Sequence, residues 1–406
     1  MEGQLLATAR PYLQFFSLVT LMPPPSSYER DADLCQRRPL IFAFGCYSCC
    51  VFLLGMYETY VNILTLNFEV RILEVEDFTS ALGMVQKTFY TILLAIIHVN
   101  MLIYYRRLGQ IYMTIAALEL DLDDASQCFG GLVKRTRFRQ RLALVIGLWI
   151  MFLLIAFPII TIPVMTEYMS WRNKILTEFI LLVVQLKSVE YVLFVVLVQE
   201  LLLRLRHTLI YLQQELTDCH QRALLQALCV ALLRNKQLMA RVWKLVGELE
   251  AYYLLPMLCL FLYNGLAMLH IVNWAYIQAF NPSDCTNCRY LRVGNLMLLL
   301  INLLIPCWLS QNCIGTYNSF KRIIHNIRCG KINPALLSNG LREYALQLEH
   351  LKLRFTCGNF FEINLKCFGS MVVTIVSFTI ILIQFKLQGI VDAKRQIMQK
   401  SPPKAH

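Results

Sequence analysis

Charged residues are scarce in this chain of 406 residues, because Asp, Glu, Lys and Arg together make up only 16% of it. Soluble domains carry about 25%. Apolar residues make up 57% and the mean hydropathy is +0.52, whereas soluble domains are roughly 45–50% apolar. A disordered chain has few apolar residues and many charged ones. A cytosolic enzyme of this length does not contain so large a fraction of apolar residues. Both classes are therefore excluded.

The sequence also lacks the short motifs of common catalytic sites: it contains no GxSxG, HExxH, Walker loop or GxGxxG. Its seven histidines are dispersed, and most of its 15 cysteines fall inside apolar stretches, where a free cysteine behaves as a small apolar side chain. Cys285 and Cys288 form a lone CxxC, for which a loop disulfide and two free thiols both stay open. We expect no enzyme activity, no cofactor and no metal site.

What the sequence does contain is long apolar runs. A transmembrane helix needs about 20 mostly apolar residues, and charged stretches separate the runs of this length. There are seven: 40–61, 82–105, 142–165, 176–200, 252–278, 294–316 and 362–388. The pattern predicts an all-α polytopic protein that crosses the lipid bilayer seven times, with its membrane domain over 40–388.

The distribution of Lys and Arg predicts the side of the membrane on which each loop lies. The loops after the first, third and fifth runs hold one or two such residues, whereas the N-terminal segment holds four and the other loops hold seven each. Basic residues favour the cytoplasmic side. We therefore expect segment 1–39 inside and tail 389–406 outside, although this tail is itself basic. The net charge of +12 then reflects topology, and nucleic acid is not expected as a partner.

Two of the predicted cytoplasmic segments have helical periodicity. Apolar residues recur every three or four positions over 203–250, which indicates that the fourth and fifth helices continue beyond the bilayer. In 334–357 the spacing is sharper, with Asn333 as a cap, Pro334 at the first helical position and Gly358 at the end. The apolar seam consists of Leu337, Leu341, Tyr344, Leu348, Leu351 and Phe355. Packing within one chain and contact between subunits both explain it.

A polar stripe runs along the last apolar run. Positions spaced alternately by four and three share one helical face, and five of these six are polar: Ser370, Thr374, Ser377, Ile381, Gln384 and Gln388. In a bilayer such a stripe must face protein or water. It either packs closely against another helix or lines a water-filled path. In the second case Gln384 offers polar groups to an ion, and Ile381 and Phe385 form an apolar constriction. A pore of this kind requires an oligomer.

The end of this run resembles the signature of insect gustatory receptors, which is Thr-Tyr, five hydrophobic residues and Gln-Phe. Here the segment reads SFTIILIQF, so Gln384-Phe385 is intact and Ser377-Phe378 replaces Thr-Tyr. The upstream run FTCGNFFEINL is similar to the family's approach to its last span. The resemblance implies a ligand-gated, non-selective cation channel in the plasma membrane of gustatory neurons. It also implies a tetramer, homomeric or with related subunits, whose last helices line the pore.

The family resemblance further implies a pocket for a small-molecule tastant in the outer half of each subunit. Such pockets are apolar with a few placed polar groups, although Trp and Tyr near helix ends also form interfacial belts. The candidates are Tyr90, Trp149, Glu190, Tyr191, Tyr253, Asn273, Trp274 and Tyr276. Nothing in the sequence suggests a sugar receptor, so we favour bitter or other non-sugar compounds that drive acceptance or avoidance.

Two other classes of membrane protein fit this sequence less well. A G-protein-coupled receptor also has seven spans, but it begins outside, and its acidic-Arg-aromatic triplet and Asn-Pro-x-x-Tyr are absent here. Secondary transporters often consist of two related halves, whereas this chain shows no repeat and an odd number of spans.

Overall fold

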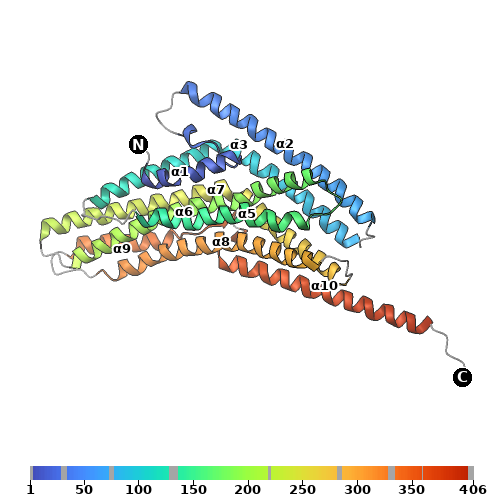
Figure 1. Ribbon diagram of the computed structural model, residues 1–406. Coiled ribbons are helices and arrows are strands. Elements are labelled where there is room, and N and C mark those ends of the chain that lie inside the picture. Colours follow the sequence, from blue (N-terminus) through green and yellow to red (C-terminus); the bar gives the residue numbers. More distant parts are fainter. Residues whose placement is uncertain are drawn as a thin grey trace.

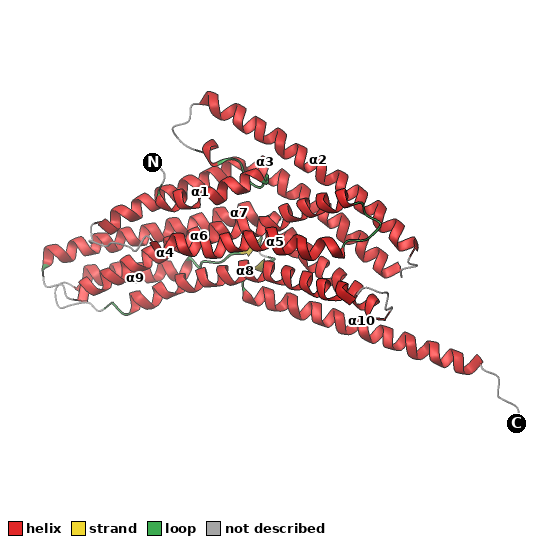
Figure 2. Ribbon diagram, viewed as in Figure 1, coloured by secondary structure: helices red, strands yellow, loops and turns green. Residues whose placement is uncertain are grey.

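The computed structural model describes residues 3–28, 34–72, 77–127, 136–217, 221–280, 286–327, 334–358 and 360–400. These residues are almost entirely helical (Figure 2). In chain order the elements are α1 (Gln4–Leu18), η1 (Pro25–Ser27), α2 (Leu34–Ile72), α3 (Asp77–Gln127), α4 (Thr136–Leu142), η2 (Ala143–Gly147), α5 (Leu148–Thr161), η3 (Ile162–Val164), α6 (Trp171–Thr217), α7 (Arg222–Phe280), α8 (Thr286–His325), α9 (Pro334–His350), β1 (Thr356–Cys357), β2 (Phe361–Glu362) and α10 (Leu365–Lys400).

Seven helical segments in the described residues are long and apolar enough to cross a membrane, which confirms the predicted class and the predicted number of spans. They are Arg38–Glu69, Thr79–Ala125, Phe138–Val164, Trp171–Thr217, Ala223–Ala275, Tyr290–His325 and Leu365–Phe385. The third segment is built from α4, the π-helical turn η2, α5 and the short helix η3. Several helices are much longer than a bilayer requires, and together they form an elongated bundle (Figure 1).

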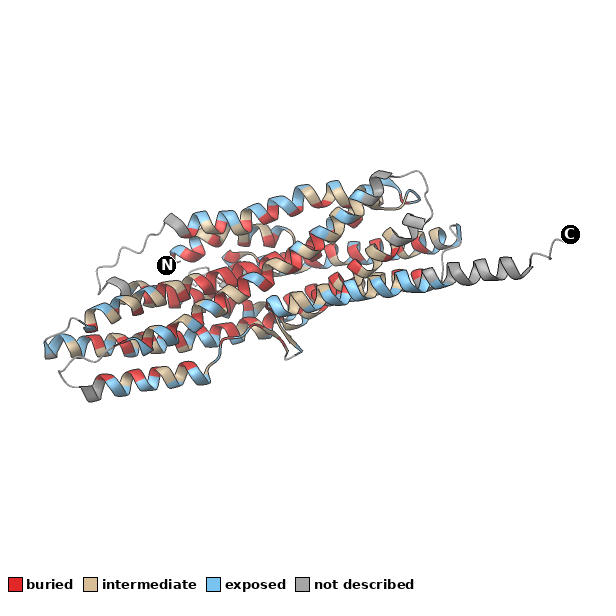
Figure 3. Cartoon of the chain, turned by 90° about the horizontal axis from the view of Figure 1, so that it is seen from below, coloured by how far each residue is buried: buried red, intermediate tan, exposed pale blue. Residues whose placement is uncertain are grey.

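Helix α6 lies at the centre of the bundle and α10 at its edge. In the most apolar window of α6, 89% of the residues are buried, against 6% in α10. Burial is concentrated in the middle of the bundle, whereas α10 is exposed along most of its described length (Figure 3). A helix that is apolar on all sides belongs in a core, and α6 packs against α2, α3, α5, α7 and α8.

Polar side chains inside the core are hydrogen-bonded across helices. Gln185 on α6 donates from Nε2 to Oδ1 of Asn264 on α7 at 2.9 Å, and it accepts a bond from Asn302 on α8. Ser188 donates to the backbone carbonyl of Asn302 at 3.2 Å. A buried amide without a partner is costly, so these bonds fix the mutual register of α6, α7 and α8.

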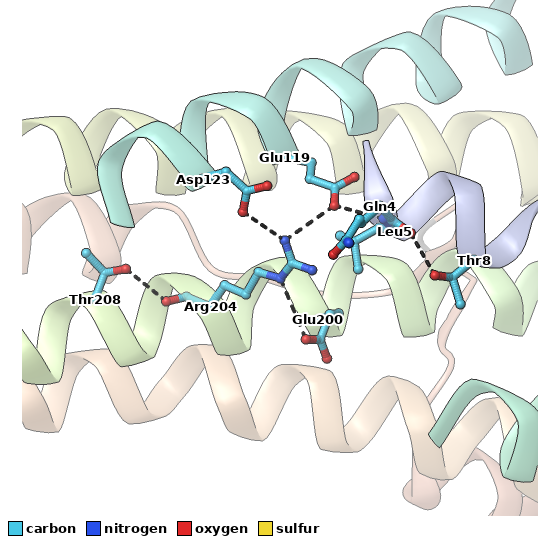
Figure 4. Close-up of polar contacts among 8 residues, drawn as sticks. All are labelled: Gln4, Leu5, Thr8, Glu119, Asp123, Glu200, Arg204 and Thr208. Atoms are coloured by element: carbon cyan, nitrogen blue, oxygen red, sulfur yellow. Dashed lines mark hydrogen bonds and ion pairs between the residues drawn. The ribbon is translucent and has the colours of Figure 1, made fainter. Parts of the chain in front are cut away.

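The helical extensions predicted over 203–250 are present, because α6 continues to Thr217 and α7 begins at Arg222. Arg204 on α6 connects α6 to α3 (Figure 4). Its guanidinium Nη1 lies 3.4 Å from a carboxylate oxygen of Glu119 and 3.3 Å from one of Asp123, and its Nε lies 3.7 Å from Glu200. Glu119 is fully buried, so this carboxylate depends on Arg204 for its compensating charge.

The N-terminal helix α1 is docked onto the bundle through the same carboxylate. The backbone N–H of Leu5 donates to Oε1 of Glu119 at 2.8 Å (Figure 4). An acceptor at this place satisfies a donor that the helix itself leaves unpaired. A Cβ atom on Gly3 would lie only 1.9 Å from Oε2 of Glu119, so a larger residue at this position would displace the carboxylate.

The helix predicted over 334–357 is shorter in the structure. α9 begins at Pro334 as predicted, while the cap Asn333 lies outside the described residues, and the helix ends at His350. The prediction that it continues to Gly358 is wrong. Side chains from neighbouring helices satisfy the next backbone carbonyls, because Tyr317 donates to Leu351 and the indole of Trp243 donates to Lys352 at 3.2 Å.

Gly358 ends a different element from the one predicted. It has a φ of +57°, a conformation that costs other residues more than glycine. It forms the turn of a short antiparallel hairpin in which Cys357 pairs with Phe361. The hairpin leads directly into α10.

The apolar seam of α9 packs within the chain. Leu337, Leu341, Leu348 and Tyr344 are 9% exposed or less, and the hydroxyl of Tyr344 donates to Oδ1 of Asn235 on α7 at 2.7 Å. Beyond the helix, Phe355 is also buried and Leu351 is half-buried. The structure therefore has the seam packed within one chain. Little of the surface of these side chains remains exposed for contact with a second subunit.

Cys357 is expected to resist thiol reagents in the folded protein. Its side chain is 1% exposed, and burial raises the pKa of its thiol to about 12. Because maleimides react with the thiolate, we expect no labelling of Cys357 at pH 7.5 until the protein is denatured. Mass spectrometry of the labelled peptide measures this, with the half-buried Cys229 as the internal control. Equal labelling of Cys357 before and after denaturation would contradict the buried hairpin.

Candidate pore helix and ligand cavity

The polar stripe of α10 is uncovered in the single chain. All six positions of the stripe are exposed: Ser370, Thr374, Ser377, Ile381, Gln384 and Gln388. The hydroxyls of Ser370 and Thr374 donate to the backbone carbonyls four residues earlier, at 3.0 and 2.9 Å. Such bonds reduce the cost of placing a hydroxyl in a bilayer. These two hydroxyls are therefore satisfied within α10, whereas the six side chains of the stripe all remain exposed in the described structure.

The opposite side of α10 holds the helix against the bundle. Ile375 is buried there, and Phe368 and Met371 pack against the core. A Cβ on Gly265 of α7 would lie 3.6 Å from the Met371 side chain, so the two helices run close together at that level. α10 is thus anchored by one apolar side, and its polar side points away from its own chain.

Two large apolar side chains lie beside Gln384. Ile381 is 47% exposed and Phe385 is 69% exposed. An apolar ring next to a polar ring is an arrangement that gates channels by excluding water. One chain has only one of each of these side chains, so rings of them would require several copies of the chain.

A cavity of about 210 Å³ lies at the end of the bundle where α2 meets α3, α5 meets α6 and α7 meets α8. Its lining is mostly apolar, with polar groups from several helices. The charged and aromatic members include Glu69, Lys87, Tyr90, His270, Trp274 and Arg292. This combination is typical of a small-molecule site.

Several polar groups at the cavity are without a hydrogen-bond partner among the described residues. They are Oε1 of Gln86, the hydroxyl of Tyr90, Nδ1 of His270 and Nε of Arg292. The Arg292 guanidinium lies over the Trp274 ring at 5.4 Å, and the His270 ring stands edge-on to the same indole. Buried polar atoms are normally paired, so these groups are available to a ligand.

Two buried carboxylates lie directly behind the cavity wall. Glu58 accepts a hydrogen bond from Thr177, and Glu178 accepts one from Thr161. Both threonines line the cavity. In the sequence, the two glutamates are recognisable only as acidic residues inside apolar runs. The cavity has no signal in the sequence, because residues from six helices form it.

Of the eight predicted pocket residues, Tyr90 and Trp274 line this cavity. Trp149 is buried elsewhere in the core, and Asn273 donates to the Thr79 hydroxyl at 2.8 Å. The side chain of Tyr276 lies outside the described residues. Neither Trp149 nor Asn273 contributes to the wall of the cavity.

The other three predicted pocket residues belong to a buried ion-pair cluster on α6 and α7. Lys187 Nζ lies 2.8 Å from a Glu190 oxygen, and the hydroxyl of Tyr253 donates to the other oxygen at 2.8 Å. The Lys187 ammonium also lies 5.2 and 5.1 Å from the ring centres of Tyr252 and Tyr253. Tyr191 bonds Ser310 at 3.2 Å. Both ions are fully buried and paired with each other, and the cluster belongs to the core, because none of its residues lines the cavity.

The CxxC of the sequence falls largely outside the part of the chain that the structure describes. Cys285 and the side chain of Cys288 both belong to the residues that are not described. Within the described ranges, no group of three His, Cys, Asp or Glu side chains is arranged to hold a metal ion.

Comparison with known proteins gives a match over nearly the whole chain. The family profile described as 7tm chemosensory receptor matches residues 9–389. The putative gustatory receptor 98b of Drosophila melanogaster is 50% identical over 391 residues, which cover 96% of each chain. The putative gustatory receptor 98c of the same species is 43% identical over 389 residues, with 95% of each chain covered.

Solved structures of similar fold are those of the insect olfactory receptor OR5 from Machilis hrabei. The first superimposes with a TM-score of 0.65 at 13% identity, over 93% of this chain and 98% of that one. A second structure of OR5, in complex with eugenol, gives a TM-score of 0.64 at 14% identity over the same shares.

Proposed function

Because the chain belongs to the 7tm chemosensory receptor family of insects, we propose that it is a subunit of a ligand-gated, non-selective cation channel that detects small-molecule tastants. The family is one of multi-pass membrane receptors without enzymatic activity. The similarity of its fold to that of an olfactory receptor supports a channel over a G-protein-coupled receptor or a transporter.

The exposed polar stripe of α10 is the observation that carries the proposal. A membrane helix with a polar side must face protein or water, and the described part of this chain leaves that side uncovered. Four copies that turn this side toward a common axis would enclose a water-filled path. In that assembly Gln384 forms a polar ring, and Ile381 and Phe385 form the gate beside it.

The proposal places the N-terminus inside the cell and the C-terminus outside. The clusters of Lys and Arg support this orientation, and the exposed Arg106 and Arg107 follow the exposed Tyr104 on α3. A basic pair next to aromatic residues is typical of a membrane boundary. The cavity of 210 Å³ then opens toward the outside.

We propose this cavity as the tastant site. Its unpaired groups on Tyr90, His270 and Arg292 favour a ligand that offers hydrogen-bonding groups together with apolar surface. Bitter or other non-sugar compounds remain our preferred class, and the response would drive acceptance or avoidance behaviour.

The proposed function is tested by a ligand screen with current recording in cells that otherwise lack such receptors. The chain is expressed alone and together with a related subunit. We expect ligand-evoked cation current that reverses near 0 mV, as a non-selective pore requires. Saturable uptake of the ligand without current would favour a transporter, and a response that depends on G proteins would favour the receptor alternative.

Substitution of Trp274→Ala is expected to raise the ligand concentration for half-maximal current about tenfold and to leave the maximal current unchanged. The substitution removes an aromatic contact and the ring beneath Arg292, which together are worth about 1–2 kcal/mol. Dose–response curves measure the effect. Trp171→Ala is the matched control, because Trp171 is 66% exposed and does not line the cavity. Equal shifts in both variants, or a shift in neither, would contradict the proposed site.

A further inference from the structure

Three free cysteines lie close together on the outward face of α2. Cys46, Cys49 and Cys50 are all exposed, and their spacing of three and four residues puts them on one side of a helix. The residues between and beside them that face the bundle are Ser48 and Val51, which are buried. The three thiols therefore point away from the protein, toward lipid.

The packing of α2 against α3 sets the depth of these thiols in the membrane. The two helices are antiparallel, because Phe52 packs against His98 with ring centres 5.8 Å apart, and a Cβ on Gly55 would meet Leu94. When this register is extended along the pair, Cys46 lies level with Tyr104 and Cys50 lies about one turn deeper.

The residues around Tyr104 have the pattern that is typical of a boundary between lipid and water. The guanidinium of Arg107 lies 5.8 Å from the centre of the Tyr104 ring, and that of Arg106 lies 5.8 Å from the centre of the Tyr105 ring. Aromatic rings at the headgroup level, followed at once by basic residues, mark the edge of the hydrocarbon. The three cysteines therefore lie just inside this edge.

The face of α2 that carries the cysteines is also remote from the proposed pore. α2 and α10 lie on opposite sides of the bundle (Figure 1), and α2 packs mainly against α3 and α6. If α10 turns toward the axis of an oligomer, the thiols of α2 turn toward its periphery, where a membrane enzyme can reach them.

We propose that Cys46, Cys49 and Cys50 form a site of S-acylation by long-chain fatty acyl-coenzyme A, a modification typical of juxtamembrane cysteines. The cysteine sulfur attacks the carbonyl carbon of the acyl thioester and forms a new thioester. Coenzyme A leaves as its thiol and takes up the proton that the cysteine loses. The acyl chains then lie along the exposed apolar face of α2, beside side chains such as Leu53.

The inference rests on the orientation in the proposed function, because acyl-coenzyme A is cytosolic and the basic boundary at Arg106 and Arg107 must then face the cytoplasm. Acyl exchange tests it on the full-length receptor. Free thiols are first blocked with N-ethylmaleimide under denaturing conditions. Hydroxylamine then cleaves the thioesters, and a maleimide polymer adds one mass increment for each cysteine that was acylated. We expect up to three increments from these cysteines, and the variant C46S/C49S/C50S should lose all of them.

Control variants separate acylation from damage to the fold. C307A/C313A replaces two buried cysteines of α8. It should leave unchanged the ladder, that is, the series of gel bands that differ by one mass increment. Each single substitution of Cys46, Cys49 or Cys50 should remove at most one increment, so the test stands even where the triple variant folds poorly. An unchanged ladder in the triple variant, or a wild-type receptor at the cell surface without any increment, would overturn the inference.

An epitope tag at the N-terminus distinguishes this failure from that of the proposed orientation. If the tag is inaccessible on intact cells and no increment appears, only the acylation site is wrong. If antibody reaches the tag on intact cells, the orientation and the acylation site are both wrong.

Discussion

Replacement of Gln384 by lysine is expected to abolish the cation current of a receptor that still reaches the cell surface. In the proposed pore, each subunit would then place a fixed positive charge beside the ion path. At a distance of about 5 Å and an effective dielectric constant of about 20, one such charge repels a monovalent cation by about 3 kcal/mol. A single charge thus lowers cation occupancy by more than about a hundredfold, and four copies act together.

Saturating ligand and whole-cell recording measure this effect, with current normalised to the amount of biotinylated receptor at the surface. Ile383→Lys is the matched control, because it places the same charge one position earlier, about 100° around the helix. That side chain can extend its ammonium toward the nearby membrane surface, so current should persist. Undiminished current in Gln384→Lys, or an equal loss in both variants, would remove α10 from the pore.

The substitution Glu190→Ala is expected to prevent folding of most of the receptor. Glu190 and Lys187 are both fully buried and form an ion pair with N···O of 2.8 Å. Removal of the carboxylate leaves an ammonium without a counter-charge in the protein core, a loss of about 3–5 kcal/mol. We expect less than about a tenth of the wild-type amount at the cell surface and a lower thermal midpoint by fluorescence-detected size exclusion.

A compensating variant shows whether the missing charge is the cause. In K187M/E190Q neither ion remains, and the amide that replaces the carboxylate still offers an oxygen to the hydroxyl of Tyr253, so the surface amount should recover substantially. Replacement of both members of a buried pair is often neutral. Wild-type surface level in Glu190→Ala, or no recovery in the double variant, would contradict a role in core stability and return Glu190 to the candidates for ligand contact.

The sequence alone determined the features that depend on local patterns. Runs of about 20 apolar residues predict seven membrane helices because the bilayer leaves a backbone few other ways to pair its hydrogen bonds. The stripe of α10 is equally local, because the spacing of Ser377, Ile381 and Gln384 places them on one helical side wherever that helix lies. The extensions of α6 and α7 follow from the same periodicity.

Other features depend on contacts that the sequence does not encode locally. Periodicity predicts a helix up to Gly358, but hydrogen bonds from Tyr317 and Trp243 hold the carbonyls of Leu351 and Lys352 instead. In the same way, the apolar seam around Tyr344 is compatible with two partners, and only its packing on α7 decides between them.

The candidate ligand site illustrates the same limit. Tyr90 and Trp274 lie 184 positions apart in the chain, and both line one cavity with Arg292. Glu190 and Tyr253 are of residue types that are common in binding pockets. Their polar groups are already paired, however, because Glu190 bonds both Lys187 and the hydroxyl of Tyr253. Residue type and depth were determined by the sequence. Which polar atoms remain unpaired was decided by the tertiary structure, because a hydrogen bond between distant helices exists only once those helices have packed.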